Sequence, residues 1–158
     1  MRSFLSILFV MIATVAMGQS AGVSLTGELH DRTLPVDIKA DALTVDQDNQ
    51  QAVFKGNAEV VQGGLTLSAD EISVTYSADG AEIEQLEATG SVFFSNSAEE
   101  ARAETATYTV PTGDLVMLGG VTLVQGPSQI SGDSLEMNIL TNIAQMKGNV
   151  RTKLVPRN

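Results

Sequence analysis

The chain has 158 residues, no cysteine, no tryptophan and a formal net charge of −10. This length corresponds to a single domain. Without cysteine there are no disulfides, so burial and backbone pairing alone must hold the fold together. The acidic balance argues against nucleic acid and anionic membrane surfaces as partners, because both are bound through basic faces.

The N-terminus has the composition of a secretory signal peptide. Arg2 supplies a basic start, an apolar run follows over Phe4–Met17, and small residues lie before Gln19. The run is shorter than the about 20 apolar residues of a transmembrane helix, although an uncleaved anchor is the alternative. The expected organisation is a cleaved signal peptide at 1–18, a flexible N-terminal segment at 19–33 and one domain at 34–156.

A repeat of about 29 residues covers that domain. Its two recurring features are glycines at Gly56, Gly90, Gly119 and Gly148, and acidic residues after a small residue at Asp41, Asp70, Glu104 and Asp133. Each of the first three glycines is followed by an acidic position 14 residues later, and each acidic position by a glycine 15 residues later, except for one interval of 20. The long interval predicts an insertion at 77–80. Four units at a fixed period indicate a repeat architecture.

Around each glycine the apolar residues alternate strictly, as in Ala52, Phe54, Gly56, Ala58 and Val60. This period of two predicts strands with one buried face. Around each acidic residue the alternation slips by one position, which is typical of a β-bulge or corner. We therefore expect a bulge in each acidic run.

The resulting fold class is all-β, without helix after the signal peptide. Eight bent runs are expected at 36–46, 51–62, 64–76, 82–95, 101–110, 114–125, 128–139 and 142–155. If each run folds at its centre, the domain has about sixteen short antiparallel strands in two facing sheets. Gly- and Pro-containing turns join the runs, so the units stack like a solenoid whose first and last runs are open edges.

Catalytic chemistry finds little support in these residues. The single histidine, His30, lies before the first expected strand, so a histidine-based triad is implausible. Carboxylate pairs could perform glycosidase chemistry, and the candidates are Glu82, Glu84, Glu87, Glu99 and Glu100. Their positions in or beside polar turns favour solvated faces. No catalytic residue and no cofactor is expected.

The repeated acidic residues could also bind calcium, which prefers clustered oxygens. Each repeat, however, offers only one or two acids and no glycine-rich nonapeptide array. The simpler interpretation is that Asp41, Asp70, Glu104 and Asp133 cap backbone amides at the bulges. No metal site is expected.

Several short stretches, in order and with compatible spacing, resemble the OstA-like family of lipopolysaccharide-transport bridge proteins. They are Pro35–Asp41, Phe54–Ala58, Gln62–Gly63, Ala69–Val74, Leu118–Val121 and Lys153–Pro156. The resemblance covers about residues 34–156. It implies an elongated, open β-jellyroll in the periplasm whose groove shields the acyl chains of lipid A. It also implies head-to-tail joining to further copies, to an inner-membrane-anchored LptC-like protein and to the soluble domain of an outer-membrane LptD-like translocon.

The inward apolar residues by themselves fit either a groove or a filled core. A structural β-solenoid, such as an adhesin passenger or a filament-forming repeat protein, is therefore the alternative. If the groove implied by the resemblance exists, its lining is expected to be Val36, Ile38, Phe54, Leu67, Val74, Leu86, Phe94, Tyr108, Val110, Met117, Val121 and Met137.

Charge is distributed unequally between the two ends of the domain. Residues 28–48 carry a balance of −4, whereas residues 137–158 carry +4 and no acid. Opposite charges on the two edges favour head-to-tail over head-to-head contacts. The expected assembly residues are Asp37 and Asp41 at the first edge and Arg151 and Lys153 at the last. The alternative is a solvated basic tail, or one that meets lipid phosphate.

Overall fold

The computed structural model describes residues 22–24 and 34–155. The expected signal peptide, His30 and most of the expected flexible segment lie outside the described residues. The described part contains eleven strands and no helix. The strands are β1 (Gly22–Ser24), β2 (Val36–Lys39), β3 (Ala42–Asp46), β4 (Gln51–Gln62), β5 (Leu65–Tyr76), β6 (Ile83–Ser95), β7 (Glu99–Thr109), β8 (Asp114–Gln125), β9 (Ser128–Asn138), β10 (Ile143–Lys147) and β11 (Arg151–Lys153).

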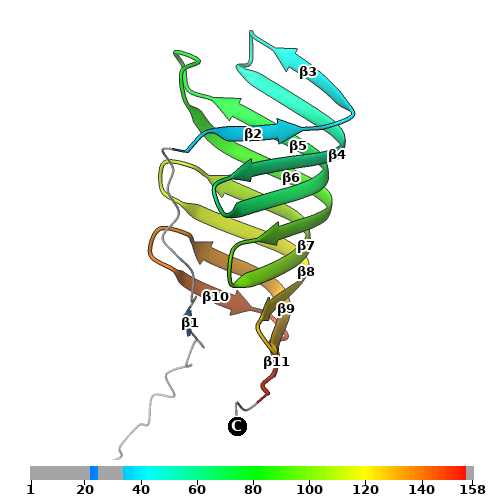
Figure 1. Cartoon of the computed structure of the whole chain (residues 1–158), viewed down its shortest axis with the longest axis vertical. Helices are drawn as coiled ribbons and strands as arrows, with labels where there is room; N and C mark the ends of the chain where they lie inside the picture. The colour runs from blue at the N-terminus through cyan, green and yellow to red at the C-terminus, as the bar shows by residue number, and fades with distance from the viewer. Residues whose placement is uncertain (1–21, 25–33, 156–158) are drawn as a thin grey trace, which may run out of the picture.

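All strands belong to one antiparallel sheet with the order β1-β10-β9-β8-β7-β6-β5-β4-β2, in which β3 also pairs with β4 and β11 also pairs with β9. Figure 1 shows the strands stacked along the long axis and bent, so that the sheet folds around an interior. The all-β jellyroll predicted from the sequence is confirmed. The count of eleven differs from the expected sixteen because β4 to β9 pass through the bend unbroken, whereas the first and last runs each split into two strands.

The bend is built on the glycine strands. Between β4 and β5, Lys55 pairs with Glu71 and Ala58 with Ala69, so that Gly56 and Asn57 together oppose one residue. Their φ angles are 77° and 47°, in the left-handed region that glycine and asparagine adopt most readily. The prediction from the sequence, which placed the bulge in the acidic runs, is wrong. The acidic strand is one residue shorter through the bend, which is why its alternation slips there.

Each acidic residue of the repeat packs over the glycine of the following run. The Asp41 carboxylate accepts a hydrogen bond of 2.8 Å from the Asn57 side-chain amide, and Asp133 accepts one of the same length from Asn149. The Asp41 and Asp133 backbone N–H groups donate to the carbonyls of Gly56 and Gly148 at 2.9 Å. Within the described residues, no group of three or more His, Cys, Asp or Glu side chains could hold a metal ion. Asp41 and Asp133 therefore tie the first and last of these bends to the neighbouring run.

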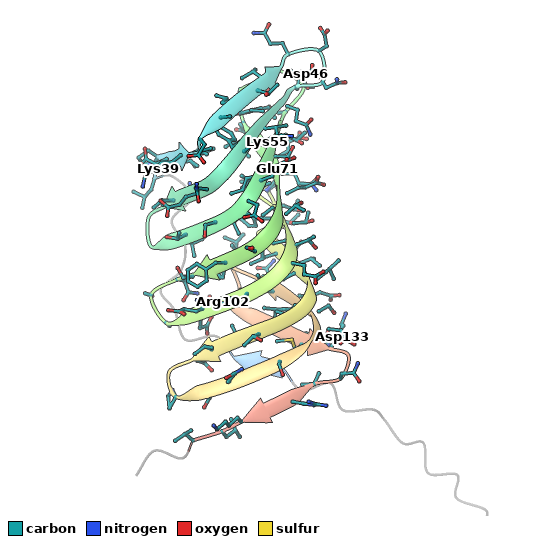
Figure 2. All side chains as sticks on the ribbon, turned by 90° about the vertical axis from the view of Figure 1, so that its right-hand side faces the viewer. Lys39, Asp46, Lys55, Glu71, Arg102 and Asp133 are labelled. Carbon is teal, nitrogen blue, oxygen red and sulfur yellow. The ribbon has the colours of Figure 1, made fainter. Side chains whose placement is uncertain are left out.

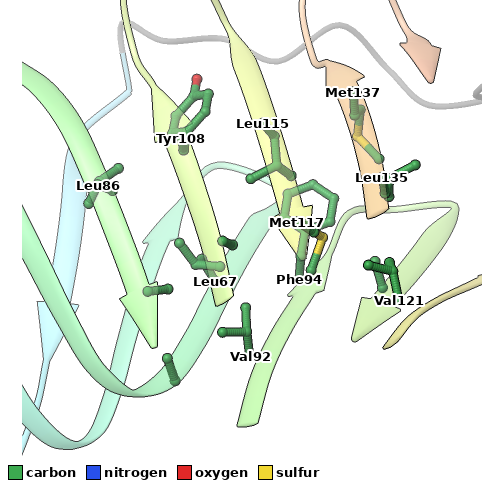
Figure 3. Close-up of a cluster of buried hydrophobic side chains, with 14 of the residues drawn as sticks. Leu67, Leu86, Val92, Phe94, Tyr108, Leu115, Met117, Val121, Leu135 and Met137 are labelled. Carbon is green, nitrogen blue, oxygen red and sulfur yellow. The ribbon is translucent and has the colours of Figure 1, made fainter. Parts of the chain in front are cut away.

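The two faces of the sheet differ in composition. The inner face buries aliphatic side chains and methionines, several of which Figure 3 shows packed together, and the largest fully buried ones are Ile72, Leu115, Met117, Leu123 and Leu135. The outer face carries cross-strand ion pairs between Lys39 and Glu59, Lys55 and Glu71, and Lys147 and Glu136, and Figure 2 labels Lys39, Lys55 and Glu71 among these residues. Exposed pairs contribute at most about 1 kcal/mol each, so burial of the inner face dominates stability.

Candidate functional site

The interior is filled along the bend but hollow near β2. A cavity of about 570 Å³ lies between the two halves of the folded sheet. Its lining is Leu34, Val36, Val60, Gln62, Leu65, Thr66, Leu67, Glu82, Ile83, Leu86, Phe94, Tyr108, Val110, Pro111, Leu115 and Ile139. This volume is within the usual range of ligand pockets, about 300–1,000 Å³.

Strand register explains why these walls are apolar. On one half of the sheet Val60 pairs with Leu67 and Leu67 with Phe94. On the other half Leu86 pairs with Tyr108 and Tyr108 with Leu115. Directly paired residues point to the same side of a sheet, so each half presents a continuous apolar row.

The same rows continue along the whole stack in both directions. The row through Phe94 reads Ile38, Val60, Leu67, Phe94, Ala101, Leu123, Ile130 and Thr152. The row through Tyr108 reads Val45, Ala52, Val74, Leu86, Tyr108, Leu115, Met137 and Ala144. The cavity is thus a local widening between two apolar rows that extend from one end of the domain to the other.

The structure divides the twelve lining residues expected from the sequence into two groups. Those on the cavity wall are Val36, Leu67, Leu86, Phe94, Tyr108 and Val110. The others are Ile38 and Phe54, which are partly buried against the core, and Val74, Met117, Val121 and Met137, which are buried within it. The two methionines therefore fill space beside the cavity.

Several cavity residues were missed in the sequence. Val60 and Leu115 share the inward alternation of the residues that were chosen, so their pattern could have identified them. Leu34 and Pro111 lie outside the strands, where alternation gives no signal. Whether an inward residue lines the cavity or packs in the core depends on the separation of the two half-sheets, which is a property of the folded domain.

The polar lining residues in the described part of the chain include Gln62, Thr66 and Glu82, and no described lining residue is a lysine or an arginine. Glu82 is exposed, as are Glu84, Glu87 and Glu100, in agreement with the solvated faces expected for them. A cavity of this kind offers apolar contact to a ligand and no cation for an anionic group.

The expectation of a solvated face is wrong for Glu99, which is only 2% exposed. Its carboxylate accepts hydrogen bonds from the side-chain amides of Gln125, at 3.0 Å, and Asn96, at 3.4 Å. The Asn96 side chain also accepts a hydrogen bond from the Glu99 backbone N–H at 2.8 Å. Glu99 thus fixes the β6–β7 hairpin to the end of β8.

Three aspartates stabilise the β3–β4, β5–β6 and β7–β8 hairpin turns, which lie at the edge of the half-sheet that carries the row through Tyr108. The pKa of Asp46 is held below its ordinary value of 3.8 by hydrogen bonds from the Asn49 side chain and backbone. The pKa of Asp79 is lowered by the Ser77 hydroxyl and the Ala81 backbone N–H, and the pKa of Asp114 is lowered by hydrogen bonds from the Thr112 and Asn138 side chains. Hydrogen bonds to the charged form favour that form, so these carboxylates stay ionised at neutral pH and act as turn anchors.

The residues expected at the assembly edges lie at opposite ends of the stack. Asp37 and Asp41 are exposed at the end formed by β2 and β3, and Arg151 and Lys153 are exposed on β11 at the other end (Figure 1). Large apolar side chains are exposed at the same two ends, with Leu43 at 55%, Val45 at 59% and Leu154 at 72%.

The fold and the cavity define an open β-jellyroll with an apolar interior groove. No helix in the described part of the chain is long and apolar enough to span a membrane. The family model described as LptA/(LptD N-terminal domain) LPS transport protein matches residues 37–143, about two thirds of the chain. The chain belongs to this family of lipopolysaccharide-transport proteins.

The chain is also similar to two known proteins. An uncharacterised protein of Rhizobium meliloti (strain 1021) is 30% identical over 93% of this chain and 85% of its own length. The crystal structure of LptH, the LptA-homologous periplasmic component of the lipopolysaccharide transport device of Pseudomonas aeruginosa, superposes with a TM-score of 0.73. That alignment covers 80% of this chain and 99% of LptH at 16% identity, and it shows a common fold.

Proposed function

We propose that this protein is a non-enzymatic periplasmic carrier that shields the acyl chains of lipid A in its groove. The observation that carries the proposal is the 570 Å³ cavity between two apolar rows in a member of a lipopolysaccharide-transport family. Burial of each acyl methylene contributes about 0.8 kcal/mol. A few buried methylenes per chain are therefore enough for useful affinity.

The charge distribution indicates how the ligand sits. None of the described residues that line the cavity is lysine or arginine, and the chain has a net charge of −10. A phosphate placed there would lose hydration without gaining a counter-ion. The acyl chains accordingly enter the groove, while the phosphates and sugars stay in solvent.

The two apolar rows also suggest how lipid moves. They present similar contacts at each step along the stack, so an acyl chain can slide without a large change in contact energy. The exposed edges at both ends are templates for strand addition. In this proposal further copies, an inner-membrane-anchored LptC-like protein and the soluble domain of an outer-membrane LptD-like translocon join head to tail and extend the rows into a bridge.

A structural solenoid with a filled core is the second candidate. The buried side chains along the bend, such as Ile72 and Met117, fit it. A filled core, however, leaves no cavity of this size, because protein interiors are close-packed. Lipid or detergent that co-purifies with the domain would favour the carrier.

A matched pair of valines tests the groove. Val36 lines the cavity and Val124 lies on the outer face of β8, and both are 36% exposed, so aspartate at either site is compatible with folding. We expect Val36→Asp to weaken lipopolysaccharide binding by about tenfold or more, because it places a charge beside acyl chains. Val124→Asp should bind like the parent chain.

Binding is measured at concentrations at which the chain is monomeric, since Val36 also lies near an assembly edge. Thermal unfolding of both variants confirms that each is folded. Equal binding by the two variants contradicts the groove and favours the filled solenoid.

A further inference from the structure

One edge of the stack is already occupied by the chain's own N-terminal part. β1 pairs antiparallel with the outer edge of β10, with Gly22 opposite Gln145, Val23 opposite Ala144 and Ser24 opposite Ile143. β11, which continues the same edge on the other half-sheet, pairs only with β9 among the described strands. The edge at this end is therefore half covered and half open.

The internal repeat predicts the register in which another chain would add to this edge. Wherever a glycine strand is followed by an acidic strand, the residue before the glycine pairs with the residue after the acid. The three instances are Lys55 with Glu71, Thr89 with Thr105, and Leu118 with Ser134. On the other side of the bend, the second residue after the glycine pairs with the residue before the acid, as Val121 does with Gly132.

Glycine and acidic runs alternate, and the domain has eight runs, so its last run carries Gly148 and its first run carries Asp41. A second copy that follows head to tail therefore continues the alternation. The same rule pairs Lys147 with Ala42 of the second copy, and Val150 with Ala40.

Extended along both strands, this register continues the inward rows and pairs charged residues on the outer face. It pairs Ala144 with Val45 and Thr152 with Ile38, which continues both apolar rows from one copy into the next. It also places Lys153 directly opposite Asp37, an opposite-charge pair of the kind that stabilises antiparallel strands, and Arg151 directly opposite Lys39, a like-charge pair that works against it.

β1 occupies part of that register. The residues that it faces, Gln145, Ala144 and Ile143, are the ones assigned to Thr44, Val45 and Asp46 of an incoming β3. β1 runs antiparallel to β10 with Val23 opposite Ala144, and the predicted register would place Val45 of an incoming antiparallel β3 at the same position. β1 thus takes the place of a second copy's β3.

We infer that β1 is an internal placeholder that guards the C-terminal edge and must be displaced when a following chain adds there. The inference rests on the proposed head-to-tail assembly. An incoming β2 docks first on the open β11, with Asp37 opposite Lys153, and its β3 then replaces β1 on β10.

Chain length is compatible with pairing inside one molecule. The twelve residue steps from Ser24 to Val36 can span about 40 Å. The eight inter-strand steps from β1 to β2 cover about 38 Å. β1 therefore reaches the β10 edge with little excess length, and it covers a row of backbone groups that would otherwise pair non-specifically.

A disulfide lock tests the placeholder, because the chain has no cysteine of its own. Val23→Cys with Ala144→Cys places two thiols at directly opposed positions, whose spacing suits a disulfide. We expect the oxidised protein to self-associate at least about tenfold more weakly than the same protein after reduction, because its β10 edge cannot open. Deletion of residues 19–24 should strengthen association about tenfold for the same reason. Sedimentation velocity measures both.

Two controls separate the possible failures. Val116→Cys with Glu136→Cys forms a disulfide between β8 and β9, away from both edges, and should not alter association. Asp37→Cys mixed with Lys153→Cys should crosslink two chains in the predicted register, which reports head-to-tail assembly directly.

Each other outcome is decisive. If the lock leaves association unchanged while the Asp37–Lys153 crosslink forms, the placeholder is refuted and head-to-tail assembly stands. If the Asp37→Cys and Lys153→Cys chains do not crosslink, even when residues 19–24 are deleted from them, the head-to-tail part of the proposed function fails. The guarding role then fails with it. If the Val23 and Ala144 thiols do not join, or join two chains, β1 is not an internal guard.

Discussion

Gly119 and Gly120 form one of the bends, and their surroundings separate two reasons for glycine. Both have positive φ, 88° and 65°. A Cβ on Gly119 would lie 2.6 Å from the Glu104 Cβ, whereas a Cβ on Gly120 would have no atom within 4 Å. Gly119 is thus required by backbone conformation and by the acid packed over it, and Gly120 by conformation alone.

Alanine at each position measures the two effects. Gly120→Ala should cost about 1–2 kcal/mol of unfolding free energy, the penalty of a left-handed alanine. Gly119→Ala should cost about 1–3 kcal/mol more, because Glu104 must be displaced. Chemical denaturation of both variants gives the difference, and equal losses would show that the acid over the glycine has no steric role.

The recurrence of glycine and acid could be read from the sequence because it is a matter of spacing. The sequence did not reveal that the extra residue of the bulge lies on the glycine strand and not on the acidic strand. Slipped alternation at Asp70 shows that faces change there, but the cause is the φ angles of Gly56 and Asn57 on the neighbouring strand, which apolar patterning does not report.

Strand β6 carries two adjacent phenylalanines with opposite roles. Phe94 is 3% exposed on the inner face, and Phe93 lies on the outer face with the Arg102 guanidinium 4.7 Å from its ring centre. Burial accounts for most of the contribution of Phe94 to stability. The contribution of Phe93 comes mainly from an exposed cation–π contact of about 0.5–1 kcal/mol.

Replacing each by alanine tests the assignment of faces. Phe94→Ala should lower the unfolding free energy by about 3 kcal/mol, and Phe93→Ala by no more than about 1 kcal/mol. The two variants remove the same atoms from neighbouring positions. Similar losses measured by thermal unfolding would contradict a sheet with one buried face.

The strand positions could be predicted well because alternation and turn residues are local. The run expected at 51–62 coincides with β4, and the run expected at 128–139 ends one residue after β9. Glu99 could not be predicted, because its burial depends on side-chain amides from Asn96 and from Gln125 on another strand.

At the scale of the molecule, the sequence indicated which residues face inward but not where the interior opens. Met117 and Leu86 belong to the same inward set, yet only Leu86 lines the cavity. The difference arises from the spacing of the half-sheets, which depends on every strand at once. The family resemblance, and not the alternation, was what pointed to a groove.

The charged ends lead to a prediction about assembly. Lys153→Glu should weaken self-association by up to about tenfold, because its opposite-charge pair with Asp37 across the edge contributes about 0.2–1 kcal/mol and becomes repulsive. Asp37→Lys in the partner copy should restore association, and added salt should reduce the difference by screening. Light scattering across salt concentrations measures this. Indifference to salt and to charge reversal would refute the electrostatic orientation and leave strand addition intact.

The central claim, that lipid A acyl chains occupy the groove, is tested most directly by photocrosslinking from Tyr108. A benzophenone amino acid at Tyr108 projects into the cavity, and the same group at Thr107 projects from the opposite face of β7. After irradiation with purified lipopolysaccharide, we predict a crosslinked product from Tyr108 and little or none from Thr107. Equal labelling at both positions, or none at Tyr108 in a folded protein, would contradict the account.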